Sequence, residues 1–143
     1  MDLLRRLTAI APTELPDAEA RLALAALLVR VARADGLYAM EEVERIDRIL
    51  TRRYDLDAFQ AARLRAEAED LEQAAPDTIR FTKALKDAVP LSERTALVEA
   101  LWSVALADGL RDADEDQQLR LMAHLLGLSD MDSAMARKRA ERN

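Results

Sequence analysis

The stretch RLALAALLVRVARADGLYAMEEVE, residues 21–44, recurs 73 positions later as RTALVEALWSVALADGLRDADEDQ, residues 94–117. The two stretches share leucine, valine and alanine positions, an Asp-Gly-Leu triplet, and a glutamate six residues after the glycine. Alanine and leucine can align by chance in this chain, but the triplet and the glutamate are harder to match in that way. Because self-similarity at a fixed offset indicates a repeated structural unit, we interpret the chain as two copies, about residues 21–54 and 94–128.

Each copy predicts two helices joined by a turn. The first helix is apolar on nearly all sides, which is typical of a buried central helix. Gly36 in the first copy and Gly109 in the second can take a positive φ just past the helix end. An amphipathic helix follows, with apolar residues at spacings of three and four. These residues are Val43, Ile46, Ile49 and Leu50 in the first copy, and Leu119, Met122, Leu125 and Leu126 in the second.

Further helices are expected around the two copies. Asp55 or Asp57 suits the N-cap of a helix that ends near residue 73. Pro76 suits the first turn of the next helix. Pro90 and Ser92 mark the break and the cap before the second central helix. The remaining landmarks are a short helix around residues 3–7 and an N-cap at Ser129 for the last helix.

The sequence therefore predicts an all-α fold. Alanine and leucine dominate, glycine is scarce, and no segment has the pattern of a strand. We expect a single domain over residues 1–143, a compact bundle of seven to eight helices with an internal pseudo-two-fold repeat.

Charge and composition exclude several classes of function. The net charge of -6 argues against nucleic acid as a partner. The chain has no cysteine, which excludes disulfides, thiolate metal sites and a cysteine nucleophile. His124 is the only histidine, so neither a zinc site nor a hydrolytic triad is supported. The longest apolar run, residues 22–29, is too short to span a bilayer, and residues 1–14 lack a secretory signal. We expect a cytoplasmic protein.

The acidic stretch ADGLRDADED, residues 107–116, raises the question of a metal site. In both copies the spacing from the glycine to the glutamate is that of an EF-hand loop. The first and third ligand positions, however, would be Val31 and Arg33, or Val104 and Leu106. These side chains cannot donate oxygen to calcium, so we reject an EF-hand.

Two interpretations of the acids remain open. Asp112 and Glu115 have the spacing of a capping box, whereas the equivalent position in the first copy is Ala39, which leaves Glu42 without that partner. Alternatively, a two-fold relation between the copies would bring Asp35 and Glu42 toward Asp108 and Glu115. Such a cluster could supply several of the oxygens that a hard cation needs. The candidate metal ligands are Asp35, Glu42, Asp108, Asp112 and Glu115.

The doubled motif, VARADGLYAMEE and VALADGLRDADE, resembles the TerB-like family associated with tellurite resistance. The segments RFTKAL (80–85) and HLLGLSD (124–130) support the resemblance, which runs from about residue 21 to residue 132. It implies an all-α fold of about seven helices and a role in tellurite and stress response near the cytoplasmic face of the membrane. It also implies that Asp35, Glu42, Asp108 and Glu115 bind metal. The first copy departs from the family's polar turn at residues 38–40, Tyr-Ala-Met, which leaves the acids after Gly109 as the better half of a site.

We therefore expect a non-enzymatic TerB-like helical domain that binds a partner protein and is tuned by a divalent cation, Ca²⁺, Mg²⁺ or Mn²⁺. The competing hypothesis is a metal-dependent enzyme that uses clustered carboxylates for phosphoryl or hydrolytic chemistry. A third hypothesis is a structural subunit whose acids only cap helices. Acids aimed into a dry pocket favour the enzyme, whereas acids on an open face favour the binding module.

Overall fold

The computed structural model describes residues 17–34, 38–74, 82, 85–87, 89–107 and 113–142, apart from the side chains of residues 17–20, 92 and 113–115. Its labelled helices are α2 (Asp17–Arg33), α3 (Met40–Tyr54), α4 (Ala58–Ala74), α6 (Leu91–Ala105), α7 (Ala113–Leu125) and α8 (Asp130–Arg142). Thr82 and residues 85–87 are also helical, and no strand occurs within the described ranges. The predicted all-α fold is confirmed. The short helix expected around residues 3–7 and the landmark Pro76 lie outside the described residues.

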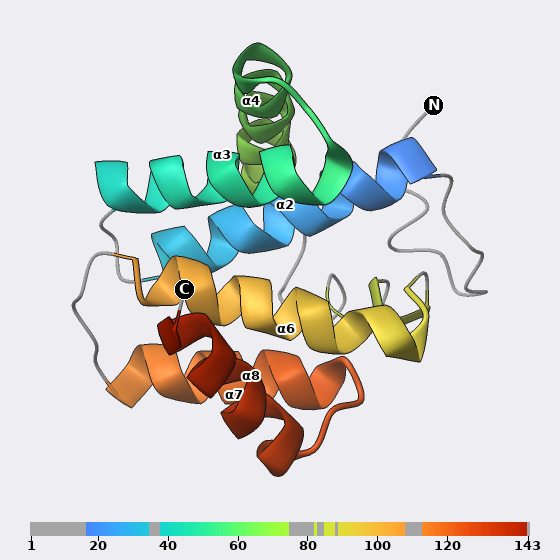
Figure 1. Cartoon of the computed structure of the whole chain (residues 1–143), viewed down its shortest axis with the longest axis vertical. Coiled ribbons are helices and arrows are strands. Elements are labelled where there is room, and N and C mark those ends of the chain that lie inside the picture. Colours follow the sequence, from blue (N-terminus) through green and yellow to red (C-terminus); the bar gives the residue numbers. More distant parts are fainter. Residues whose placement is uncertain are drawn as a thin grey trace.

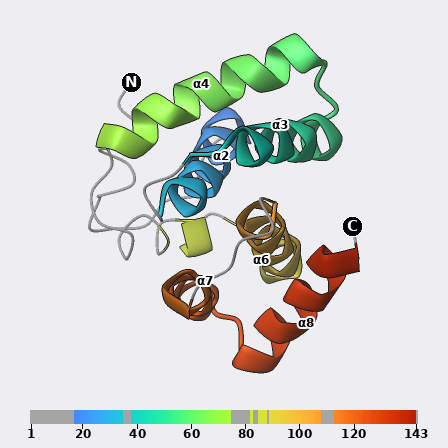
Figure 2. The same cartoon turned by 90° about the vertical axis from the view of Figure 1, so that its left-hand side faces the viewer.

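The labelled helices form two groups, α2 to α4 and α6 to α8, and the first helix of each group belongs to a central pair (Figures 1 and 2). α2 and α6 lie side by side at the centre and run in the same direction. α3 packs on α2, and α7 packs on α6. α4 lies mainly across α2, and α8 lies mainly across α6. Each central helix is thus covered by one helix that follows it directly and by a second that crosses it.

The central pair supplies most of the core, because both helices are apolar on almost every side. Every side chain from Ala23 to Val29 is at most 4% exposed. On α6 the largest fully buried side chains are Leu97, Leu101 and Trp102. Of the residues expected on the apolar sides of α3 and α7, Ile46, Leu50, Leu119, Met122 and Leu126 are buried, and Val43, Ile49 and Leu125 are half-buried. The prediction of buried central helices and amphipathic outer helices is confirmed.

The fully buried side chains of the two crossing helices are small. The buried residues of α4 are Ala61 and Ala68. Those of α8 are Ser133, Ala136 and Ala140. Small side chains let a crossing helix approach closely and bury its neighbour without leaving cavities. α4 and α8 therefore cover the core although both carry many charged residues.

Local sequence sets the helix ends, with one correction. Asp57 is the N-cap of α4: its Oδ1 accepts the N–H of Gln60 at 2.7 Å, and the Gln60 side chain accepts the N–H of Asp57 at 3.0 Å. Asp55 instead ends α3 in the left-handed conformation, with a φ of 53°. The prediction of Ser92 as N-cap of the second central helix is wrong. α6 begins at Leu91, because the carbonyl of Pro90 accepts the first helical N–H groups.

The last helix has the expected cap. The Ser129 hydroxyl accepts the N–H of Asp132 at 3.1 Å, and the Asp132 carboxylate accepts the N–H of Ser129 at 3.4 Å. These reciprocal bonds form a capping box. Gly127, just before it, has a φ of +86°, a conformation that favours glycine and lets the chain turn from α7 into α8.

The helix bounds follow the offset seen in the sequence. α3 begins at residue 40 and α7 at residue 113, which are 73 positions apart. α2 and α6, and likewise α4 and α8, begin within two residues of the same offset. The correspondence thus continues into the crossing helices, beyond the copies apparent in the sequence. The two-fold relation between the groups stays a prediction.

Among the described residues, none of the helices has both the length and the apolar content needed to cross a bilayer.

Candidate functional site

The two Asp-Gly-Leu turns are flanked by helix ends that lie at one end of the bundle. α2 ends at Arg33 and α6 ends at Ala105, both on the left in Figure 1. α3 and α7 begin at that same end, which faces the viewer in Figure 2. Because the central helices run in the same direction, the four helix ends that border the two turns all lie at this end of the bundle. We refer to this region as the acidic end.

The acidic end contains one candidate ligand whose side chain is described. Asp35, Asp108 and Asp112 lie outside the described residues, as does the side chain of Glu115, whose backbone belongs to the first turn of α7. Glu42 is described and lies in the first turn of α3. Within the described part of the chain, no three His, Asp or Glu side chains are grouped so that they could hold a metal ion.

Glu42 is almost completely buried, at 3% exposure. Its Oε1 accepts the backbone N–H of Ala39 at 3.1 Å. The sequence predicted that Glu42 lacks a capping partner because Ala39 has no polar side chain. That expectation is wrong in one respect, since the Ala39 backbone supplies half of a capping box. A buried carboxylate in the first turn is also favoured by the helix dipole.

Tyr38, where the first copy departs from the polar turn, packs against charged side chains of α2 and α4. The Arg33 guanidinium lies over its ring, 5.1 Å from the centroid. Burial, reinforced by the neighbouring Glu69 carboxylate, raises the pKa of the Tyr38 hydroxyl well above its ordinary value. The Tyr38 phenol therefore stays neutral, and it packs beside charged side chains of α2 and α4.

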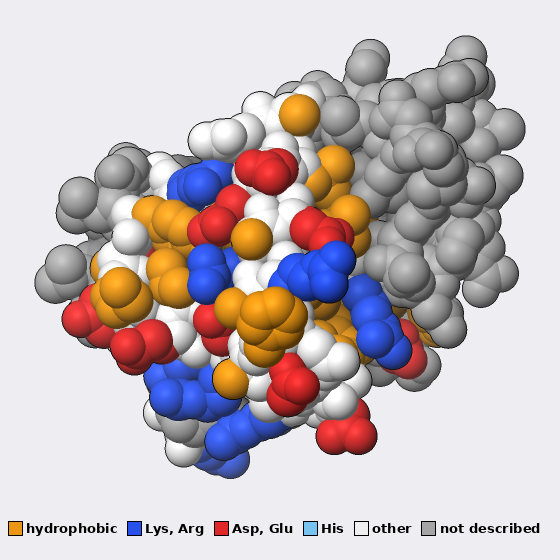
Figure 3. Space-filling view, turned by 90° about the horizontal axis from the view of Figure 1, so that it is seen from above, with side chains coloured by type: hydrophobic (Ala, Val, Ile, Leu, Met, Phe, Trp, Pro, Cys, Tyr) orange, Lys and Arg blue, Asp and Glu red, His pale blue; other side chains and the backbone are white. Residues whose placement is uncertain are grey.

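Ion pairs join α4 to α2 and to α3. The Glu72 carboxylate accepts from Arg30 at 3.4 Å and from Arg33 at 2.9 Å. Arg65 lies 2.6 Å from Asp47, joining α4 to α3. On the face viewed in Figure 3, acidic and basic side chains are interspersed. Arg65 and Glu72 of α4 thus help to hold the first group of helices together.

The chain matches the model of one known protein family. The family model described as tellurite resistance protein TerB matches residues 21–138. The chain belongs to the TerB family. The match spans both copies and most of α8, so the TerB unit includes the crossing helices as well as the repeated motif. No curated protein and no solved structure matches the chain.

In this TerB-family chain, one acid of the acidic stretch has a structural partner that the sequence did not indicate. Asp116 lies 3.4 Å from Arg137 of α8. The Arg137 guanidinium also lies over the ring of Trp102, 4.9 Å from the centroid. Trp102 is buried, and its Nε1 donates to the Ser133 Oγ at 3.2 Å. These contacts join α6, α7 and α8, and they connect residues too far apart in sequence for any local pattern to reveal them.

Proposed function

We propose that this TerB-family chain is a non-enzymatic binding module of the cytoplasm, in which a divalent cation at the acidic end controls docking of a partner protein. The proposed ligands are Asp35, Glu42, Asp108, Asp112 and Glu115, and the cation is Ca²⁺, Mg²⁺ or Mn²⁺. We propose tellurite and stress response as the setting, with the partner protein at the cytoplasmic face of the membrane. The observation that carries the proposal is the arrangement of the four helix ends that border the two turns (Figure 1).

Physical chemistry supports a cation at such a place. Carboxylates brought together without a cation repel one another and raise one another's pKa. Hard cations bind six or more oxygens from carboxylates, backbone carbonyls and water. The last carbonyls of α2 and α6 have no partner further along their own helices, so they are potential ligands as well. Two turns at the same end of the bundle would offer both kinds of oxygen.

A second candidate is a purely structural role for the acids. The hydrogen bond from the Ala39 N–H to Glu42 favours it, because it shows one of these carboxylates acting at a helix start. Under this alternative, Glu115 would act in the same way in α7, and the partner would be bound elsewhere on the surface.

Calorimetric titration of the metal-stripped protein with Ca²⁺, Mg²⁺, Mn²⁺ and Zn²⁺ separates the two candidates. The test variants are Asp108→Asn and Glu115→Gln. The matched control is Asp55→Asn, which removes the same charge at the opposite end of α3 from Glu42, where asparagine tolerates the left-handed backbone. We expect one saturable site per chain, lost in both test variants and kept in the control.

Flat titrations in the wild type would contradict the proposal. If the test variants then lost only a modest amount of melting temperature, the acids would be caps. The partner would next be sought by affinity capture, with and without the cation that binds.

A further inference from the structure

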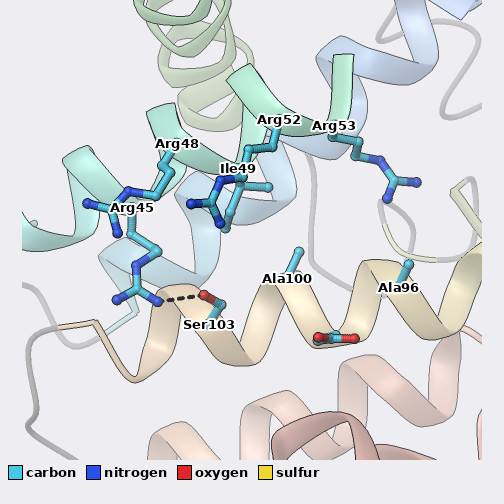
Figure 4. A pocket seen from close by; sticks show the side chains of 9 residues that line it. Arg45, Arg48, Ile49, Arg52, Arg53, Ala96, Ala100 and Ser103 are labelled. Atoms are coloured by element: carbon cyan, nitrogen blue, oxygen red, sulfur yellow. Dashed lines mark hydrogen bonds between the residues drawn. The ribbon is translucent and has the colours of Figure 1, made fainter. Parts of the chain in front are cut away.

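A groove lined by arginines opens between α3 and α6 (Figure 4). Its volume is about 630 Å³. Clefts that hold small molecules are of this size, roughly 300–1,000 Å³. One wall carries Arg45, Arg48, Arg52 and Arg53 of α3, and the other includes Glu99 and Ser103 of α6. The groove involves none of the acidic residues proposed above as cation ligands.

The arginines form a stripe along one side of α3. Residues 45, 48 and 52 are separated by three and four positions, the spacing that places side chains on the same side of a helix. At the rise of an α-helix, the stripe is about 10 Å long. Arg48 and Arg52 are exposed, whereas Arg45 and Arg53 are half-buried. Arg45 reaches across the groove, where its Nη1 donates to the Ser103 Oγ at 2.8 Å (Figure 4).

The charge of the groove is strongly positive although the chain is acidic overall. Glu99 is the carboxylate among the lining residues, and Arg139 already engages it at 3.1 Å. Four guanidinium groups on one wall repel one another, and an anion between them would relieve that repulsion. In a chain of net charge -6, such a concentration of arginine marks a place suited to an anion.

We propose that this groove binds a phosphorylated small molecule with two or more linked phosphate groups. A guanidinium group donates two parallel hydrogen bonds to a phosphate, so arginine suits this ligand better than lysine does. A single phosphate can meet only part of a stripe about 10 Å long, whereas linked phosphates can meet several guanidinium groups at once. Ile49, Ala96 and Ala100 add apolar surface against which the organic part of the ligand can pack.

Isothermal titration calorimetry of the full chain tests this proposal, with sodium tripolyphosphate and, separately, ATP as probes in magnesium-free buffer. The groove variant is Arg48→Ala/Arg52→Ala, which changes two exposed side chains. The matched control is Arg63→Ala/Arg120→Ala, which removes the same charge from exposed positions of α4 and α7. We expect one saturable tripolyphosphate site per chain, weakened at least about tenfold in the groove variant and less than about twofold in the control. Circular dichroism melts should show both variants folded.

Three results would overturn the proposal. Equal weakening in both double variants would mean that overall charge, and not the groove, attracts the anion. An absence of saturable binding for both probes would also overturn the proposal. Sedimentation with phosphatidylglycerol vesicles identifies the source of the phosphate. Binding to vesicles without binding to either soluble probe would assign the arginines to lipid headgroups and refute a small-molecule site.

Discussion

Glu42 offers a test in which substitution separates a hydrogen bond from a charge. The side chain is 3% exposed, and its Oε1 accepts the part-buried N–H of Ala39 at 3.1 Å. Glu42→Gln keeps an oxygen that can accept this bond but removes the charge. Glu42→Ala removes both.

The structure gives different magnitudes for the two substitutions. Loss of a capping hydrogen bond costs about 0.5–2 kcal/mol. Loss of a charge near the helix N-terminus costs about 0.3–1 kcal/mol. The free energy of unfolding should therefore fall by about 1–3 kcal/mol in Glu42→Ala and by about 0.3–1 kcal/mol in Glu42→Gln. For a domain of this size, each kcal/mol corresponds to roughly 3–5 °C in melting temperature.

Thermal unfolding followed by circular dichroism, in EDTA and in saturating Ca²⁺, measures both effects. Glu44→Ala, at an exposed position of the same helix, is the control and should stay within about 0.5 kcal/mol of the wild type. If Glu42 is a cation ligand, Ca²⁺ should raise the melting temperature of the wild type and of the control, but not of either Glu42 variant. Equal destabilisation by Glu42→Gln and Glu42→Ala in EDTA would refute the capping argument, because the charge and not the hydrogen bond would then be what α3 requires.

Two further predictions concern the buried polar groups. Ser133→Ala should lower the free energy of unfolding by about 1–3 kcal/mol, because it leaves the buried Trp102 Nε1–H without its acceptor. Chemical denaturation measures this loss, which should be smaller in a Trp102→Phe background. An equal loss in both backgrounds would count against the hydrogen bond. The raised pKa of Tyr38 means that the folded state favours the neutral phenol. The contribution of the phenol to the free energy of unfolding is therefore complete below the ordinary pKa of 10.0 and is lost as the pH rises above it. Tyr38→Phe should therefore lose less stability than the wild type above that pH in urea titrations, and parallel pH profiles would contradict the assignment.

Local sequence patterns were sufficient for the helices and most of their ends. Helical periodicity and caps depend on residues within about one turn of each other, so they can be read along the chain. The Ser129 cap was predicted directly, and Asp57 was one of two predicted alternatives. Ser92 was wrong because Pro90, with an extended ψ of 150°, is already the N-cap, so Ser92 lies within the first turn of α6.

Some features of the candidate site were also evident in the sequence, whereas others were not. The repeated Asp-Gly-Leu turns and the glutamates that follow them were evident in the sequence, and the TerB match confirms the resemblance that they carry. The sequence did not show that Glu42 is buried and holds the Ala39 N–H. A backbone group can be a partner whatever side chain the residue carries, so identity alone did not reveal this bond.

The sequence by itself therefore determined an all-α chain with buried central helices and amphipathic outer helices, because these follow from the spacing of neighbouring residues. Tertiary structure decided which helix faces meet. It placed the starts of α3 and α7 at one end, joined Asp116 to Arg137, and set the arginines of α3 opposite Ser103 of α6. These contacts join residues 21 and 58 positions apart, and they exist only because the apolar sides of different helices pack together and bring their polar flanks within reach.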